Sequence, residues 1–170
     1  EKLDRHQAFE FFKLNPNKKT VFVTGGSLGA RAINEGIAEH FDELMQNDIQ
    51  ILWQTGKANL EKFKHFENEH CRVFDFISNM QYAYAAADII VTRAGGVLFE
   101  LFVVGKPAIV LPSPYVADDH QTPNAEALVK RNAAIMIKDV ESKSRLVPTI
   151  IDLIKDDIKI AEMGAVMKSL

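Results

Sequence analysis

The chain has 170 residues, 47% of them hydrophobic and 25% charged, which is enough apolar material for the buried core of one domain. Its formal net charge of −3, with lysines and arginines scattered along the sequence, excludes the basic surface that nucleic-acid binding requires. Cys71 is the only cysteine, which excludes a disulfide framework and a cysteine metal site. Because no apolar run approaches the roughly 18–20 residues of a membrane span and no signal peptide opens the chain, we expect a reducing cytoplasmic compartment.

Helices and strands are predicted to alternate along the chain. Asp4 is expected to cap a first helix that carries Phe9 and Phe12 and ends before Asn15-Pro16-Asn17. Short β-branched and apolar runs predict strands at residues 20–24, 49–55, 72–76, 88–92, 108–111 and 134–137. Apolar periodicity predicts helices at residues 30–45, 58–67, 78–87 (capped by Ser78), 97–104, 121–131 and from 142 onward.

These strands are apolar on both faces, which is typical of a parallel sheet covered by helices on each side. The predicted fold class is therefore α/β, a doubly wound parallel sheet of about six strands. We expect a single domain over residues 1–170, made of a lead-in helix and turn (1–17), a Rossmann-like core (18–140) and C-terminal helices (141–170). Because the chain begins at Glu1 and ends within a predicted helix at Leu170, we expect it to be a truncated part of a longer protein.

Two glycine-rich stretches follow predicted strands. Gly25, Gly26 and Ser27 come after the first strand, and Gly95 and Gly96 come after the fourth, each ahead of a helix. Ligands of such sheets bind at the carboxyl ends of the strands, where a helix N-terminus with free N–H groups attracts an anion. The sequence therefore predicts a diphosphate site at this edge. The alternative is that these glycines only form tight turns.

Known dinucleotide and ATP motifs are absent from these loops. The Rossmann fingerprint needs a glycine where Thr24 stands and a carboxylate at the end of the second strand, which reads Trp53-Gln54-Thr55-Gly56. No Gly-Lys-Ser/Thr follows the first strand, so a P-loop is also absent. The sequence therefore does not favour binding of NAD or ATP through these motifs.

Asp118, Asp119 and His120 form a cluster that resembles part of a metal site. A carboxylate–imidazole trio needs a fourth ligand, and the sequence offers none beside it. We expect these residues to line a polar loop, and we expect no metal and no other cofactor.

Glu100 lies on an otherwise apolar predicted helix, one turn after the second glycine pair. A carboxylate there is costly unless a partner pairs with it. We expect it either to accept hydrogen bonds from two ligand hydroxyls, such as a ribose diol, or to face solvent near the N-terminal helix dipole.

Five motifs occur in order: GGSLGAR-x-x-N (residues 25–34), F-I-x-N-M (76–80), AAAD-x-x-VTRAG (85–95), GKPAI-x-x-P (105–112) and DHQ-x-x-NA (119–125). Together they cover about residues 18–140 and resemble the MurG family of bacterial glycosyltransferases. The resemblance implies the C-terminal half of a two-domain GT-B transferase, the half that binds UDP-N-acetylglucosamine. The implied reaction is inverting transfer of this sugar to lipid I, the undecaprenyl-diphosphate-muramoyl-pentapeptide, which yields lipid II for peptidoglycan synthesis.

The same resemblance assigns the acceptor to an N-terminal half that this chain lacks. In the family that half binds lipid I at the cytoplasmic face of the inner membrane and supplies the proposed base. We therefore expect no catalytic residue in this chain. The isolated chain is expected to be soluble, to bind the donor weakly and not to transfer the sugar, because no nucleophile is positioned beside it.

Individual site residues are also implied by the resemblance. Ser27 and its flanking glycines are implied to contact the donor diphosphate, the backbone of Ile77 to read the uracil edge, and Glu100 to bind the ribose hydroxyls. The sugar hydroxyls are assigned to His120, Gln121 and, on the same helix face, Asn124.

The chain departs from the family pattern in one loop. Six residues separate Arg93 from Glu100, one fewer than the family commonly has. One residue lost at a helix start rotates the rest of the helix by about 100° unless the loop absorbs it. Either the loop is tighter and Glu100 keeps its place, or donor binding is impaired.

Two other interpretations remain open. The chain is alternatively a separate donor-binding subunit of a split dolichol-type N-acetylglucosaminyltransferase. In the second alternative it is a non-catalytic module that binds a nucleotide sugar. A nucleotide-sugar epimerase of similar fold is less favoured, because the DHQ-x-x-N and RAG motifs are typical of the transferase.

Overall fold

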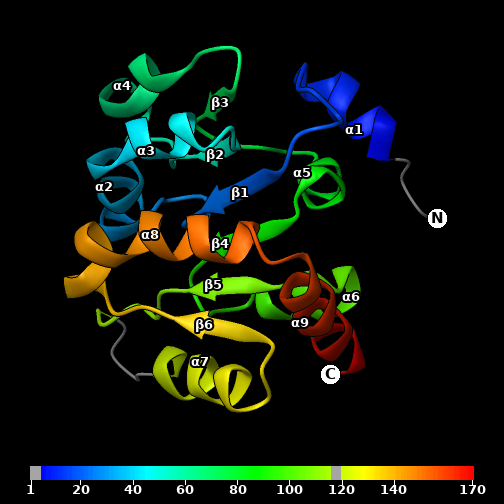
Figure 1. Cartoon of the computed structure of the whole chain (residues 1–170). Helices are drawn as coiled ribbons and strands as arrows, with labels where there is room; N and C mark the ends of the chain where they lie inside the picture. Colours follow the sequence, from blue (N-terminus) through cyan, green and yellow to red (C-terminus); the bar gives the residue numbers. More distant parts are fainter. Residues whose placement is uncertain (1–4, 116–119) are drawn as a thin grey trace.

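Six parallel strands form one sheet in the order β3-β2-β1-β4-β5-β6 (Figure 1). The computed structural model describes residues 5–115 and 120–170. The strands are β1 (Thr20–Thr24), β2 (Gln50–Gln54), β3 (Cys71–Phe74), β4 (Ile89–Thr92), β5 (Ala108–Val110) and β6 (Ala134–Met136). Every neighbouring pair is parallel. The predicted α/β class and doubly wound sheet are therefore confirmed.

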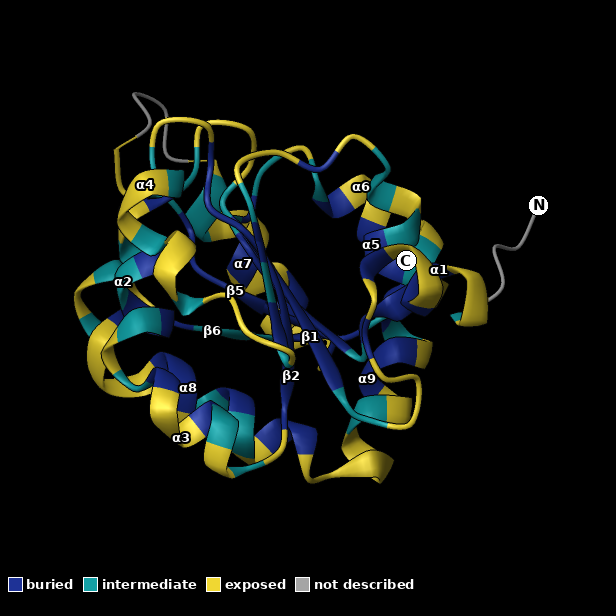
Figure 2. Ribbon diagram, turned by 90° about the horizontal axis from the view of Figure 1, so that it is seen from above, coloured by how far each residue is buried: buried dark blue, intermediate teal, exposed yellow. Residues whose placement is uncertain are grey.

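Helices cover both faces of the sheet because successive strand residues point to opposite sides. In β1, Val21 and Val23 belong to one buried cluster, and Phe22 belongs to the other. The first cluster is covered by α2 (Arg31–Glu39), α3 (Phe41–Gln46) and α8 (Ser142–Ile154). The second is covered by α1 (Arg5–Phe12), α5 (Met80–Ala86), α6 (Leu98–Val104) and α7 (Gln121–Lys130). Figure 2 shows the buried strands between these two layers.

The predicted helix over residues 30–45 is wrong as a single element. His40 has φ −128° and ψ 36°, which ends α2, and α3 starts at Phe41. Apolar periodicity continues across this break because Phe41 and Leu44 of α3 join the same buried cluster as α2. The break therefore interrupts the helix, while the parts on either side of it bury residues in the same cluster.

Two other helix predictions are wrong in part. The helix predicted at residues 58–67 is only α4 (Leu60–Phe63), followed by the 3₁₀ turn η1 (Lys64–Phe66). The predicted cap Ser78 is wrong, because Asn79 precedes α5 and no side chain caps that helix. Asp4, the predicted cap of α1, lies outside the described residues.

The first and last helices among the described residues pack against the core. Helix α1 lies on α5, where Phe11 stacks on Tyr82 with ring centroids 4.7 Å apart. At the other end, α9 (Asp157–Ser169) follows α8 and packs on α6, placing Met163 in the first buried cluster and Met167 in the second. Across residues 5–115 and 120–170, no helix is both long and apolar enough to cross a membrane.

Candidate functional site at the carboxyl edge of the sheet

The loops that follow β1, β3 and β4 line one cavity of about 260 Å³. Its lining residues are Thr24, Gly25, Gly26, Ser27, Gln54, Phe76, Met80, Thr92, Arg93, Gly95, Gly96 and Val97. Both predicted glycine-rich stretches therefore meet at one place. The cavity lies at the carboxyl ends of the strands, where doubly wound sheets bind their ligands.

The glycines of these loops have different structural reasons. Gly29 has φ +80°, and a Cβ there would lie 2.1 Å from the Thr55 carbonyl oxygen, so this glycine lets two loops pack backbone to backbone. Gly26 has φ +87°, and a Cβ on Gly26 or Gly96 would meet nothing within 4 Å. Close packing therefore explains Gly29, and the positive φ of Gly26 agrees with the tight-turn interpretation. Gly96 has neither reason, and both Gly26 and Gly96 border open space beside the cavity.

Asn34, the last residue of the first motif, has a structural role. Its side-chain oxygen accepts a hydrogen bond from Trp53 Nε1 at 2.9 Å, and its Nδ2 donates to the Thr55 carbonyl at 2.9 Å. All three residues are buried. This network fixes the start of α2 against the end of β2 and so holds the first glycine-rich loop in position.

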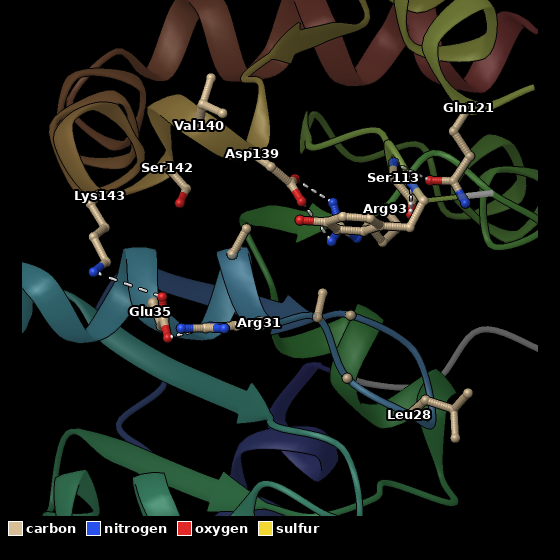
Figure 3. Close-up of a pocket in the computed structure, with 15 residues that line it drawn as sticks. Leu28, Arg31, Glu35, Arg93, Ser113, Gln121, Asp139, Val140, Ser142 and Lys143 are labelled. Carbon is tan, nitrogen blue, oxygen red and sulfur yellow. Dashed lines mark hydrogen bonds and ion pairs between the residues drawn. The ribbon is translucent and has the colours of Figure 1, made fainter. Parts of the chain in front are cut away.

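A second cavity has a volume of about 610 Å³ (Figure 3). It lies beside the first cavity, because Gly25 and Arg93 line both. Arg93 pairs with Asp139 through two hydrogen bonds of 2.5 and 3.1 Å and also donates to the Leu111 carbonyl. On the opposite wall Glu35 accepts from Arg31 at 2.8 Å, and this bond lowers the pKa of Glu35. These four charged groups therefore form two ion pairs, one on each wall of the cavity.

The start of α7 binds the loop after β4. Gln121 Oε1 accepts from the backbone N–H of Ala94 at 3.3 Å and of Ser113 at 2.8 Å, and Asn124 Nδ2 donates to the Ala94 carbonyl at 3.1 Å. Both backbone groups of Ala94 are therefore bound by α7. Gln121 lines the larger cavity, and His120 is exposed at the start of the helix.

Ile77 is buried, and its backbone N–H donates to Gln54 Oε1 at 2.7 Å. Phe76 and Met80, on either side of it in the sequence, line the smaller cavity, whereas Ile77 is not among the lining residues of either cavity. Sequence reasoning missed Gln54 as a site residue. Its only signal in the sequence is a polar side chain at the end of an apolar strand, where the dinucleotide fingerprint has a carboxylate.

Glu100 accepts a hydrogen bond from the hydroxyl of Tyr84 on α5. Burial is the larger of two causes that raise the pKa of Tyr84, and this hydrogen bond is the second. The Tyr84 hydroxyl therefore stays protonated and remains a donor. Val97 and Met80 line the smaller cavity, and Glu100 and Tyr84 come one turn after them on their respective helices. Glu100 itself is exposed in the first turn of α6, whereas Tyr84 is buried, and neither residue lines the smaller or the larger cavity.

The suggested metal cluster lies largely outside the described residues, which exclude Asp118 and Asp119. In the described ranges, no group of three His, Cys, Asp or Glu side chains is placed to hold a metal ion.

A six-stranded parallel sheet with glycine-rich loops around a cavity at its carboxyl edge defines a Rossmann-like domain, the kind found in each half of a GT-B glycosyltransferase. The chain belongs to glycosyltransferase family 28, because the C-terminal domain of that family matches residues 20–169.

Named relatives agree with this assignment. The chain is 49% identical over 150 residues to a protein of Cytophaga hutchinsonii and 42% identical over 171 residues to one of Parabacteroides distasonis. Both are named UDP-N-acetylglucosamine–N-acetylmuramyl-(pentapeptide) pyrophosphoryl-undecaprenol N-acetylglucosamine transferase. The matches cover 88% and 98% of this chain but only 41% and 46% of those proteins, so the chain spans less than half of their length.

A solved structure shows the same arrangement of elements. The crystal structure of Acinetobacter baumannii MurG superposes with a TM-score of 0.80 and 26% sequence identity. The superposition covers 99% of this chain and 49% of that one. The resemblance to the MurG family is therefore confirmed.

Proposed function

We propose that this chain is the donor-binding domain of an inverting glycosyltransferase that transfers N-acetylglucosamine from UDP-N-acetylglucosamine to lipid I, forming lipid II. The observation that carries the proposal is the convergence of both glycine-rich loops on one cavity at the carboxyl edge of the sheet. The family and the names of the relatives support the choice of donor and acceptor.

The diphosphate is proposed to lie against Gly25, Gly26 and Ser27 on one side and Gly95 and Gly96 on the other. Open space in front of Gly26 and Gly96 lets phosphate oxygens approach the backbone. As the acceptor hydroxyl attacks the anomeric carbon, the departing UDP gains negative charge. Fixed N–H dipoles at these loops stabilise that charge without reorganisation, and the proposal requires no metal ion or other cofactor.

The uridine is proposed to lie over the loop that follows β3. Phe76 and Met80 provide apolar contact there, and the backbone of Ile77 contacts the uracil edge; because the Ile77 N–H is bound by Gln54, its carbonyl is the group left for the base. Glu100 is proposed to bind the ribose hydroxyls while its other lone pairs accept from Tyr84.

The sugar is proposed to contact the start of α7. Gln121 Oε1 is committed to two backbone N–H groups, so its Nε2 is the donor left for a sugar hydroxyl. His120 is exposed at the same helix start, and Asn124 Oδ1 lies on the same helix face.

The acceptor site, the base and the membrane contact are proposed to belong to a preceding half of the full-length protein. Relatives are more than twice as long as the matched region, which supports a second half. That protein is proposed to act at the cytoplasmic face of the cell membrane, where lipid I is available.

Calorimetric titration of this chain with UDP-N-acetylglucosamine, UDP-glucose, NAD and ATP tests the donor assignment. We expect binding of the uridine nucleotides, with UDP-N-acetylglucosamine preferred over UDP-glucose. Preference for NAD, or no binding of any uridine nucleotide, would contradict the proposal.

A further inference from the structure

Gln54 is a buried side chain that joins two loops of the candidate site. It ends β2, is 2% exposed, and makes three hydrogen bonds. Its Nε2 donates to Thr24 Oγ1 at 3.0 Å and to the Gly26 carbonyl at 3.1 Å, and its Oε1 accepts from the Ile77 N–H at 2.7 Å. One amide thus connects the loop after β1 to the loop after β3.

The connection lines the smaller cavity at Thr24 and Gly26, and its other end, Ile77, lies next in sequence to the lining residue Phe76. Thr24 Oγ1 also accepts from the Gly26 N–H at 3.0 Å. The N–H of Gly26 is therefore bound by Thr24, and its carbonyl is bound by Gln54. The Ile77 peptide is held by the same amide, between Phe76 and Met80, which line the cavity. Movement of the Gln54 side chain would therefore displace both loops together.

We propose that Gln54 is a positioning residue that couples recognition of the uracil base to recognition of the diphosphate. This inference rests on the proposed function, which places the base over Ile77 and the diphosphate at Gly26. Gln54 acts through these two backbone segments. Only an amide provides both the acceptor for Ile77 and the donors for Thr24 and Gly26, because an ionised carboxylate accepts only.

The chain contains a matched control for this role. Gln50 begins the same strand, is 1% exposed, and makes hydrogen bonds of the same kinds. Its Nε2 donates to Thr20 Oγ1 at 3.1 Å and to the Asn15 carbonyl at 2.8 Å, and its Oε1 accepts from the Asn15 N–H at 2.8 Å. These contacts lie at the amino edge of the sheet, away from the cavity.

Gln54→Met and Gln50→Met separate a positioning role from a role in stability. Each variant removes three side-chain hydrogen bonds of the same kinds from a buried site. Both melting temperatures are therefore expected to fall by similar amounts. Affinities for UDP, UMP and CDP are then measured by calorimetric titration of each variant and of the unmodified chain. The ratios of these affinities report the preference for the second phosphate and for uracil over cytosine.

Gln54→Met is expected to weaken UDP binding by about ten-fold or more and to reduce both preferences together. Gln50→Met is expected to change UDP affinity by less than about two-fold and to keep both preferences. Equal affinities in the two variants, or a loss in Gln54→Met that leaves both preferences intact, would overturn the inference. If the unmodified chain bound no uridine nucleotide, the proposed function itself would be contradicted, and the inference with it.

A milder pair of variants covers the case in which Gln54→Met does not fold. Thr24→Val removes the acceptor shared by Gln54 and Gly26, and Thr20→Val removes the corresponding acceptor of Gln50. Thr24→Val is expected to lower the preference for UDP over UMP, whereas Thr20→Val leaves it unchanged. The same preference in both variants would contradict the coupling.

Discussion

At the scale of single residues, glycines in the two site loops serve different purposes. Gly29 is needed for packing, because a Cβ there would collide with the Thr55 carbonyl oxygen. Gly96 is exposed, and a Cβ there would meet no protein atom within 4 Å. The backbone conformation of Gly96 also does not lie in the positive-φ region that only glycine adopts readily. A larger side chain at Gly96 is therefore compatible with the fold.

Gly96→Leu tests whether the smaller cavity binds the donor. We expect the melting temperature to stay within about 2 °C, because substitutions at exposed positions change stability by about 0.5 kcal/mol or less. The affinity for UDP-N-acetylglucosamine should fall by about ten-fold or more, because the leucine side chain enters the space assigned to the phosphates. Gly96→Ala is the matched control and should show a smaller loss. Unchanged affinity in Gly96→Leu would place the donor elsewhere.

Glu100→Gln tests the ribose assignment. The side chain keeps its size but loses the charge that makes it a strong acceptor for two hydroxyls. We expect weaker binding of UDP and a smaller loss for 2′-deoxyuridine diphosphate, which keeps only the 3′ hydroxyl, so that the difference between the two ligands shrinks. Both affinities are measured by calorimetric titration. If UDP affinity were unchanged, Glu100 would not bind the ribose, and its carboxylate would serve only as the partner of Tyr84.

At the scale of the elements, the strands were predictable because they are buried on both faces. Each run of apolar residues in β1, β2 and β4 has no exposed face to interrupt it. The break at His40 was not predictable in this way, because the apolar pattern continues from α2 into α3. The prediction of Ser78 as a helix cap was also wrong. Asn79 precedes α5, and no side chain caps that helix, so the helix start had no capping signal to read in the sequence.

The candidate site was predicted in its loops but not in its supporting contacts. Gly26 and Gly96 were found because glycine-rich turns at strand ends leave a local signal. The hydrogen bonds of Gln54 to Gly26 and Ile77 join segments 23 to 28 positions apart, and such contacts leave no local pattern. The hydrogen bond from the Ala94 N–H to Gln121 Oε1 was not predicted for the same reason.

Lys106, which precedes β5, contacts the C-terminal end of helix α5. Its ammonium donates to the carbonyls of Ala85 and Ala87 at the end of that helix. Burial lowers the pKa of Lys106 from 10.5 to about 8. Between these two values the unfolded chain binds more protons than the folded chain at this residue, so the contribution of Lys106 to stability rises with pH.

Lys106→Met removes this titration. The free energy of unfolding of the unmodified chain, relative to that of the variant, should be constant below pH 8 and should increase between about pH 8 and 10. Urea unfolding of both proteins at pH 7, 8, 9 and 10 measures the difference, and other titrating groups cancel in the comparison. A difference that is flat or that falls with pH would show that the carbonyl contacts outweigh burial.

At the scale of the whole molecule, the carboxyl edge of the sheet carries exposed apolar side chains as well as polar ones. Leu28, Tyr115 and Val140 line the larger cavity and are 85%, 83% and 92% exposed. They come from the loops after β1, β5 and β6, so one edge of the sheet gathers them. We expect a second half of the full-length protein to cover these side chains, because exposed apolar surface is often used for contact with another domain. The proposed acceptor-binding half is therefore expected to dock at the edge that carries the candidate site.

The isolated chain is expected to bind the donor without transferring its sugar. Positioning of an acceptor beside a bound donor contributes about 7–11 kcal/mol to such a reaction, and that contribution is lost without an acceptor-binding half. Radiolabelled UDP-N-acetylglucosamine, incubated with lipid I in detergent, measures transfer by this chain and by a full-length relative at equal concentration. The full-length relative should form labelled lipid II, and this chain should form none above the level without protein. Transfer at a comparable rate by this chain alone would mean that it holds both the acceptor and the base, which contradicts its assignment as a donor-binding domain.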